Sequence, residues 1–178
     1  MIDQRKLPGS LEFLVCNTSE DIIQAISSMA IRGAPALGVA GAFGVALDAI
    51  RFAATSSKDI RSNLRQTAEH LKQARPTAVN LSWGVDRVMR LMNSPEVSVD
   101  NLQEMILNEA LLMAEEDVRT NLALSKNGAQ LIDDGDTIIH HCNTGALAVV
   151  DWGTALGAIR FAHEDGKRIH VLVDETRP

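Results

Sequence analysis

A strand–helix–strand pattern near the end of the chain limits the folds that are open to it. Residues 137–142 (TIIHHC) are typical of a buried strand, residues 154–164 have helical periodicity, and residues 169–173 (IHVLV) form a second strand-like run. Short links between such elements make a βαβ unit, whose two strands run parallel. Parallel sheets normally have several strands, so the pattern predicts the opening of an α/β domain.

The residues before this unit are predicted to be helical. After a short strand at 11–15, periodicity and capping residues indicate helices over about 19–29, 35–54, 57–74, 78–92 and 98–132. Gly38, Gly41 and Gly44 lie in the second of these, where each glycine costs about 1 kcal/mol relative to alanine. Their spacing predicts a closely approaching neighbour helix. We therefore expect a helical domain over 1–133 and the first βαβ unit of a Rossmann-like domain over 134–178.

The composition excludes several classes of protein. The chain has 178 residues, of which 46% are hydrophobic and 22% charged, the balance of a folded globular protein rather than of a disordered tail or a coiled-coil rod. Its 23 acidic residues outnumber its 17 basic ones and give a formal net charge of −6. Nucleic-acid phosphates are bound mainly by clustered cations, and the sequence has no run of Lys or Arg. We therefore expect no nucleic-acid partner.

Neither a membrane nor a metal is expected as a partner. The longest uncharged run, Gly33 to Leu47, is shorter than the roughly 20 apolar residues that cross a bilayer, and it suits a packed core helix. The first residues lack the apolar segment of a signal peptide. Cys16 and Cys142 form no zinc-type cluster, so no metal or cofactor is expected. The sequence leaves a disulfide between them open but favours a reducing, cytoplasmic location.

Cys142 is the first candidate for chemistry. It follows the first predicted strand, at the edge where α/β folds collect their ligands, and a helix N-terminus nearby suits a reactive thiol. His140 lies on the same face of the strand, and a Cys–His pair suggests nucleophilic catalysis. Asp174 and Glu175 end the second strand, where acids often face a ligand. A buried, inert cysteine and a structural histidine explain the same positions, so both interpretations stay open.

Two arginine segments are candidates for anion binding. Arg32, Gly33 and Ala34 precede the glycine-rich helix, where a guanidinium and free backbone N–H groups together suit a phosphate. Arg75 stands at a second helix break, followed by a proline and a threonine. A plain helix–helix turn explains the first segment without a ligand. The second segment is explained without a ligand if the positive charge of Arg75 interacts favourably with the dipole at a helix C-terminus.

Six segments carry the most specific patterns of the chain. They are IDQRKLP (2–8), IRGAPALG (31–38), ARPTAVNL (74–81), HCNTGALA (141–148), GTALG (153–157) and DETRP (174–178). Together they resemble the methylthioribose-1-phosphate isomerases, in order and in approximate spacing. The resemblance covers nearly the whole chain, and HCNTGA is its most specific part.

The resemblance implies a fold, a reaction and a set of roles. The superfamily also includes ribose-1,5-bisphosphate isomerases and regulatory subunits of translation initiation factor 2B. Its members have a mainly helical N-terminal domain and a Rossmann-like C-terminal domain, and they usually form dimers. The isomerase converts 5-methylthioribose 1-phosphate to 5-methylthioribulose 1-phosphate in methionine salvage. By this resemblance Arg32, Gly33, Ala34 and Arg75 bind the sugar phosphate, and Cys142 is catalytic.

The chain also departs from the family in ways that set expectations. Family members are about twice as long, and their catalytic aspartate matches no residue here. We therefore expect an N-terminal part that is inactive alone and whose sheet needs the missing half. Thr144 stands where alanine is common, a change that should be tolerated. A ribose-1,5-bisphosphate isomerase and a non-catalytic regulatory subunit remain alternatives. GALA (145–148) and GTALG argue against the former, and HCNTGA against the latter.

Overall fold

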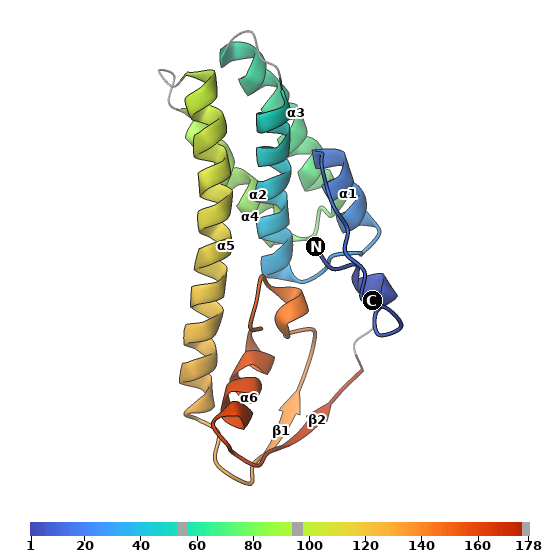
Figure 1. Cartoon of the computed structure of the whole chain (residues 1–178), viewed down its shortest axis with the longest axis vertical. Coiled ribbons are helices and arrows are strands. Elements are labelled where there is room, and N and C mark those ends of the chain that lie inside the picture. Colours follow the sequence, from blue (N-terminus) through green and yellow to red (C-terminus); the bar gives the residue numbers. More distant parts are fainter. Residues whose placement is uncertain (53–56, 94–97, 176–178) are drawn as a thin grey trace. The chain divides into compact units, whose positions relative to one another are not determined.

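In a computed structural model, the described residues are 1–52, 57–93 and 98–175. They form, in chain order, η1 (Gln4–Lys6), α1 (Ser19–Ser27), α2 (Ala34–Arg51), α3 (Ser57–Ala74), α4 (Val79–Met89), η2 (Arg90–Asn93), α5 (Val99–Ala129), β1 (Thr137–His140), η3 (Ala146–Ala148), α6 (Ala155–Glu164) and β2 (His170–Val173), where η marks a 3-10 helix (Figure 1). The predicted fold class is confirmed, because a mainly helical segment is followed by the opening of a parallel α/β unit.

The helix starts follow capping side chains that the sequence supplies. Thr18 caps α1, where its hydroxyl accepts the Asp21 N–H and the Asp21 carboxylate accepts the Thr18 N–H. Ser98 precedes α5 and accepts the N–H of Asn101 at 3.3 Å. These bonds satisfy donors that have no partner inside the helix, which explains why the helices begin at these points.

The expected strand at 11–15 is not formed. Phe13 makes one isolated antiparallel bridge with Ile2, and the flanking bonds run from Asp3 N to Glu12 O and from Leu14 N to Met1 O. The pairing stops there because the chain turns into η1 at Gln4, which removes the backbone that a longer ladder needs. The last predicted residues of the second helix, 53 and 54, and the predicted break at Pro95 lie outside the described residues.

The chain divides into two compact units, Met1–Ala114 and Glu115–Pro178. This division falls inside α5, whereas the boundary that we expected near residue 133 marks the change from helix to strand. The first half of α5 contributes Leu102, Ile106 and Ala110 to the hydrophobic core of the first unit. Compactness and secondary structure therefore divide this chain at different points.

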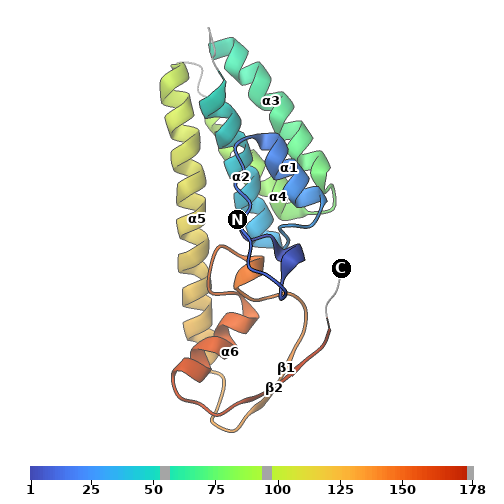
Figure 2. The same ribbon diagram turned by 45° about the vertical axis from the view of Figure 1, so that its right-hand side comes forward.

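In the first unit, α2 packs against α1, α3 and α4 (Figure 2). The predicted close approach at its glycines is confirmed. A Cβ atom at Gly38 would lie 2.9 Å from the Asn80 carbonyl oxygen, one at Gly41 2.7 Å from a methyl of Leu81, and one at Gly44 2.8 Å from a methyl of Leu71.

The helix α2 is also long and apolar enough, by length and composition alone, to cross a bilayer. However, 61% of it is buried within the fold, as in a core helix.

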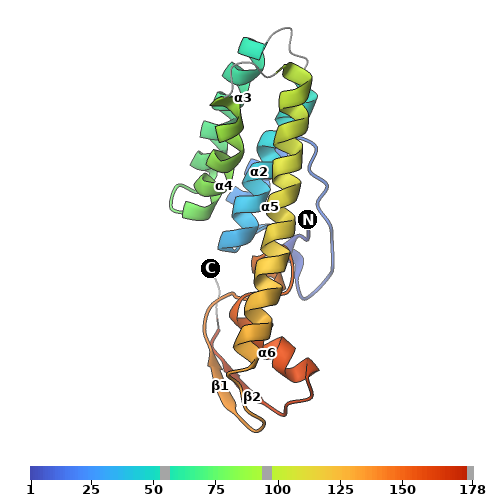
Figure 3. The same ribbon diagram turned by 90° about the vertical axis from the view of Figure 1, so that its left-hand side faces the viewer.

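In the second unit, β1 and β2 pair in parallel, as the βαβ pattern predicts, with register from Thr137–His170 to His140–Val173. The crossover helix α6 packs on the last turns of α5 (Figure 3). There a Cβ at Gly128 would lie 2.7 Å from that of Ala158, and one at Gly157 would overlap the Ser125 hydroxyl. Because the strands are parallel, the residues that follow β1 and β2 lie at one edge of the sheet.

Candidate functional site

Cys142 lies in the turn after β1 with its backbone in the left-handed region. Its φ is +74°, a conformation that costs a non-glycine residue roughly 1–2 kcal/mol. The residue is exposed and its thiol is free, as is that of Cys16. Strained backbone at non-glycine residues persists where the surroundings hold it, and it is concentrated at functional sites. The position therefore suits an accessible, fixed thiol.

Thr144 closes the turn that contains Cys142. Its hydroxyl oxygen lies 2.5 Å from Nε2 of His140, the last residue of β1, and accepts the N–H of Leu156 in the first turn of α6 at 3.0 Å. Its carbonyl accepts the N–H of Thr154 at 2.8 Å. A Cβ at Gly153, whose φ is +97°, would lie 2.8 Å from that carbonyl, so this contact requires glycine. Thr144 thus links the turn both to the end of β1 and to the start of α6.

His140 is buried, and it is held through one ring nitrogen. It is 6% exposed, and its Nδ1 has no partner within the described part of the chain. A buried N–H without an acceptor costs more than a bare lone pair, so we assign the ring proton to Nε2, which donates to Thr144. This supports the structural role for His140 that the sequence left open.

Asp174 brings the end of β2 to the residues that follow β1. Its N–H donates to the His140 carbonyl at 3.4 Å, and its carboxylate oxygen Oδ2 contacts Nδ1 of His141. The hydrogen bond from His141 is the main reason why the pKa of Asp174 lies below its ordinary value, and the Cys142 backbone N–H acts in the same direction. Glu175 follows and is exposed, whereas Thr176–Pro178 of the DETRP segment lie outside the described residues.

The first unit holds the segment Arg32–Ala34 at the start of α2. Gly33 is the N-cap residue, with φ of +112°, and no side chain caps the helix there. Arg32 is half-buried and Ala34 is exposed. Uncapped N–H groups at a helix start carry partial positive charge, so this segment suits an anion such as a phosphate.

Arg75 occupies the turn between α3 and α4, at the second uncapped helix start. It is half-buried, its carbonyl accepts the Ala78 N–H at 2.9 Å, and Ala78 begins α4 without a capping side chain. The contact between Gly38 and Asn80 places the N-terminal part of α2 against the first turn of α4. Both predicted arginine segments therefore lead into neighbouring helix starts.

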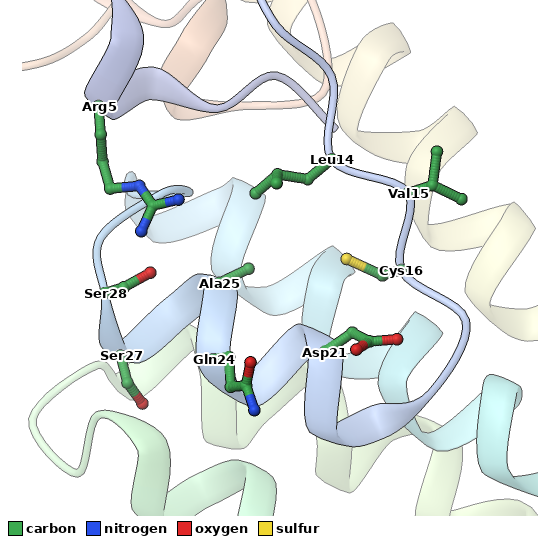
Figure 4. A pocket seen from close by; sticks show the side chains of 9 residues that line it. All are labelled: Arg5, Leu14, Val15, Cys16, Asp21, Gln24, Ala25, Ser27 and Ser28. Atoms are coloured by element: carbon green, nitrogen blue, oxygen red, sulfur yellow. The ribbon is translucent and has the colours of Figure 1, made fainter.

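A hollow of about 600 Å³ in the first unit is lined by none of the predicted site residues. Arg5, Leu14 and Cys16 point into it in Figure 4. Arg5 is already paired with Asp3, and burial raises the pKa of the Cys16 thiol, which therefore stays protonated at neutral pH. Of the two cysteines, Cys142 is thus the better placed for chemistry.

Sequence reasoning named His140 and Asp174 but missed their partners, Thr144 and His141. The missing signal for His141 was topological. Residues that directly follow two parallel strands are neighbours at one edge, so position 141 could have been paired with position 174. No local sequence pattern predicts the role of Thr144, because its partner Leu156 lies 12 residues further along the chain and comes close only when the turn is folded.

A mainly helical unit followed by the opening βαβ unit of a parallel sheet is the architecture that this chain shares with solved structures of initiation-factor-2B-like α/β proteins. The chain belongs to the initiation factor 2 subunit family, whose sequence profile matches residues 30–178.

Individual relatives and solved structures show which members of the family this chain is similar to. Methylthioribose-1-phosphate isomerase of Synechococcus sp. is 48% identical over all 178 residues, which make up 51% of that protein. The crystal structure of 5-methylthioribose 1-phosphate isomerase from Pyrococcus horikoshii has a TM-score of 0.90 and 31% identity over 97% of this chain and 56% of its own. A structure named translation initiation factor eIF-2B subunit delta, from A. fulgidus, has a TM-score of 0.87 and 45% identity over 100% and 52%. The chain spans about half the length of the curated relatives it matches.

Proposed function

We propose that the protein to which this chain belongs is an isomerase that converts 5-methylthioribose 1-phosphate to 5-methylthioribulose 1-phosphate in methionine salvage. The observation that carries the proposal is Cys142, exposed and left-handed at the end of β1 within the HCNTGA segment. Relatives that carry this enzyme's name, at about half identity along the whole chain, support it. No metal or cofactor is part of the proposal.

The reaction explains why such residues are needed. Because the anomeric carbon of the substrate carries phosphate, simple ring opening to an aldehyde is blocked. The enzyme must assist ring opening and move hydrogen from C2 to C1. We assign phosphate binding to Arg32, Gly33, Ala34 and Arg75, where guanidinium groups and uncapped helix starts provide positive charge. Cys142 is assigned the acid–base or electrostatic role at the sugar.

A regulatory subunit of the translation-factor type is the second candidate. The specific observation in its favour is the A. fulgidus structure, which carries that name at 45% identity. A non-catalytic relative has no need of a strained, exposed cysteine, and this favours the isomerase. A ribose-1,5-bisphosphate isomerase is a third candidate, which differs from the first only in its substrate.

Turnover on the two sugar phosphates tests these candidates. The purified full-length protein is incubated with 5-methylthioribose 1-phosphate or ribose 1,5-bisphosphate, and ketose formation is followed by NMR. Conversion of the first substrate alone supports the proposal, and conversion of the second alone transfers it to the related isomerase. Turnover of neither, by folded protein, favours the regulatory subunit.

We also propose a cytoplasmic location and a homodimer. Two free cysteines suit a reducing compartment. The dimer is what the family resemblance implies, and light scattering of the purified full-length protein during size exclusion measures it. A mass of one chain in solution would contradict it.

A further inference from the structure

We propose that Asp117 is a positioning residue of the proposed active site, which fixes the loop that follows Cys142 by accepting a hydrogen bond from the Val150 N–H. This loop, residues 143–154, is called the Cys142 loop below. The inference deepens the proposed function and rests on it for the reaction that the loop serves. Asp117 itself is assigned no contact with the substrate. The contacts that carry the inference lie within the second unit, on one face of α5.

Three polar residues form a row along α5. Asp117, Asn121 and Ser125 are four residues apart, so they lie on one face of the helix. Asn121 is 4% exposed, and Ser125 is fully buried. The Asn121 amide donates to the Asp117 carbonyl at 2.9 Å, and the Ser125 hydroxyl donates to the Asn121 carbonyl at 2.7 Å. These bonds satisfy polar groups that are costly to bury alone, so this face of α5 can pack against other elements.

The elements that pack on this row are the Cys142 loop and α6. Val150 of the loop donates its N–H to Asp117 Oδ2 at 2.7 Å. Two turns further along α5, Gly157 of α6 lies so close to Ser125 that an added Cβ would overlap the hydroxyl. One face of α5 is therefore a common support for the loop and for the helix that follows it.

The base of the Cys142 loop is closed two to three residues after Cys142. Gly145 pairs with Gly153 in an isolated antiparallel bridge. The Thr154 N–H donates to the Thr144 carbonyl at 2.8 Å. Because the start and the end of the loop are joined in this way, a movement of the loop is passed on to the turn that holds the thiol.

A single turn of 3-10 helix joins this base to Val150. In η3 the Ala148 N–H donates to the Gly145 carbonyl at 3.0 Å, and Val150 follows two residues later. The side chains of Ala148 and Val149 are buried, and packed side chains have little freedom to shift. The bond to Asp117 therefore holds the loop from a separate helix, while the bridge holds its base.

The backbone is strained just before the Cys142 loop and again near its end. Cys142 and Trp152 each have a φ of +74°. Such conformations of non-glycine residues persist only where the surroundings over-determine them. The Trp152 N–H donates to the neighbouring Asp151 carboxylate at 2.6 Å, whereas Asp117 contributes its bond from 33 positions away in the chain. Loss of the Asp117 acceptor should therefore allow the turn at Cys142 to relax.

The charge of Asp117 does not itself stabilise the fold. Burial raises the pKa of Asp117 above its ordinary value, and the hydrogen bonds from the Val150 N–H and the Asn121 side chain offset this only in part. A carboxyl whose pKa is raised by folding ionises less readily in the fold than in the unfolded chain, so its ionisation at neutral pH costs stability. What the carboxylate provides is a strong acceptor for the loop.

Two substitutions in the full-length protein test the positioning role. Asp117→Ala removes the acceptor of the Val150 N–H, and Asp117→Asn retains an oxygen at the same place. We expect kcat of Asp117→Ala to fall about tenfold with KM nearly unchanged, because the lost bond displaces the reacting thiol and not the phosphate-binding segments. Asp117→Asn should recover most of kcat. An Asp117→Asn as impaired as Asp117→Ala would overturn the proposal.

The matched control is Glu115→Ala, which removes an exposed acid from the same helix and should behave as wild type. Asp117→Ala with the kcat of this control would overturn the proposal. Asp117→Leu, which keeps the bulk of the side chain without an oxygen, replaces Asp117→Ala if circular dichroism shows the latter to be unfolded.

Cysteine alkylation separates this inference from the proposed function, because it needs no substrate. Wild type and Asp117→Ala are treated with iodoacetamide, and peptide mass spectrometry follows Cys142, with Cys16 of the first unit as an internal reference. Cys142 should react several-fold faster in Asp117→Ala, and Cys16 should react equally in both. Equal Cys142 rates would overturn the inference. A wild type that converts neither sugar phosphate defeats the proposed function, while the alkylation rates still test the positioning of Cys142.

Discussion

Gly84 lies directly against the backbone of Gly38. A Cβ atom at position 84 would stand 2.6 Å from the Gly38 carbonyl carbon, closer than real Cβ atoms approach backbone. This contact and that of Gly38 with Asn80 hold α4 against the start of α2. The approach therefore also determines where the two arginine segments lie relative to each other, within the first unit.

Gly84→Ala should destabilise the first unit by about 1–3 kcal/mol, the usual cost of overpacking, because the obstructing atoms are backbone and cannot rotate away. Urea unfolding followed by circular dichroism measures this. Gly9→Ala is the control, since its added Cβ would meet only the Lys6 carbonyl oxygen at 3.4 Å. Equal stability of the two variants would show that the helices can separate without cost.

Arg75→Ala should raise KM for the sugar phosphate with a smaller effect on kcat, because the guanidinium is assigned to the phosphate group and not to the reacting carbons. Steady-state kinetics of the full-length protein measures both constants. Arg65→Ala, which removes an exposed arginine in the middle of α3, should leave KM unchanged. An unchanged KM with reduced stability in Arg75→Ala would assign this arginine to the helix dipole instead.

Cys142→Ala should leave the fold intact and lower turnover at least about 10²-fold, the scale of an acid–base or electrostatic partner. Near-normal turnover would remove Cys142 from the mechanism. Cys142→Gly should be equally inactive but more stable than Cys142→Ala by roughly 1 kcal/mol, because glycine adopts a φ of +74° without strain. Thermal unfolding of the two variants compares their stability.

Thr144→Ala should cost stability in this chain, although alanine is common there in the family that the sequence resembles. It removes the partner of the buried His140 Nε2 and the acceptor of the Leu156 N–H, and an unsatisfied buried donor costs about 1–3 kcal/mol. Thr144→Ser retains the hydroxyl and should lose much less. Equal melting temperatures of Thr144→Ala and Thr144→Ser would indicate that the methyl group of Thr144, and not its hydroxyl, contributes the stability.

Asp3 should make the first unit sensitive to acid. Its buried side chain accepts from Arg5 Nε at 2.8 Å and Nη2 at 2.6 Å, and the hydrogen bond to Arg5 is the main reason that the pKa of Asp3 is lowered. A carboxyl with a lowered folded-state pKa stabilises the fold above its unfolded value, and this stability is lost as pH falls through the folded value.

Asp3→Asn should therefore be less stable than wild type at neutral pH, and the difference should shrink in acid. Urea unfolding at a series of pH values measures this, with the exposed Glu20→Gln as control. A difference that stays constant with pH would mean that Asp3 contributes through packing and not through its charge.

Local patterns predicted most elements because each depends on neighbours in the chain. The helices α1 to α6, the two parallel strands, and the close packing at Gly38, Gly41 and Gly44 follow from periodicity, capping residues and glycine spacing. The strand at 11–15 was wrong because a strand needs a partner, and the chain before Gln4 supplies only one bridging residue.

The sequence by itself determined which elements form, which family the chain resembles, and that Cys142 follows a strand. Only the tertiary structure decided that Cys142 is left-handed, that Asp174 holds His141, and that Thr144 links His140 to α6. The reason is physical. Periodicity and capping act within a few residues, whereas these contacts join side chains up to 33 positions apart, and only the parallel pairing of β1 and β2 brings the most distant of them together.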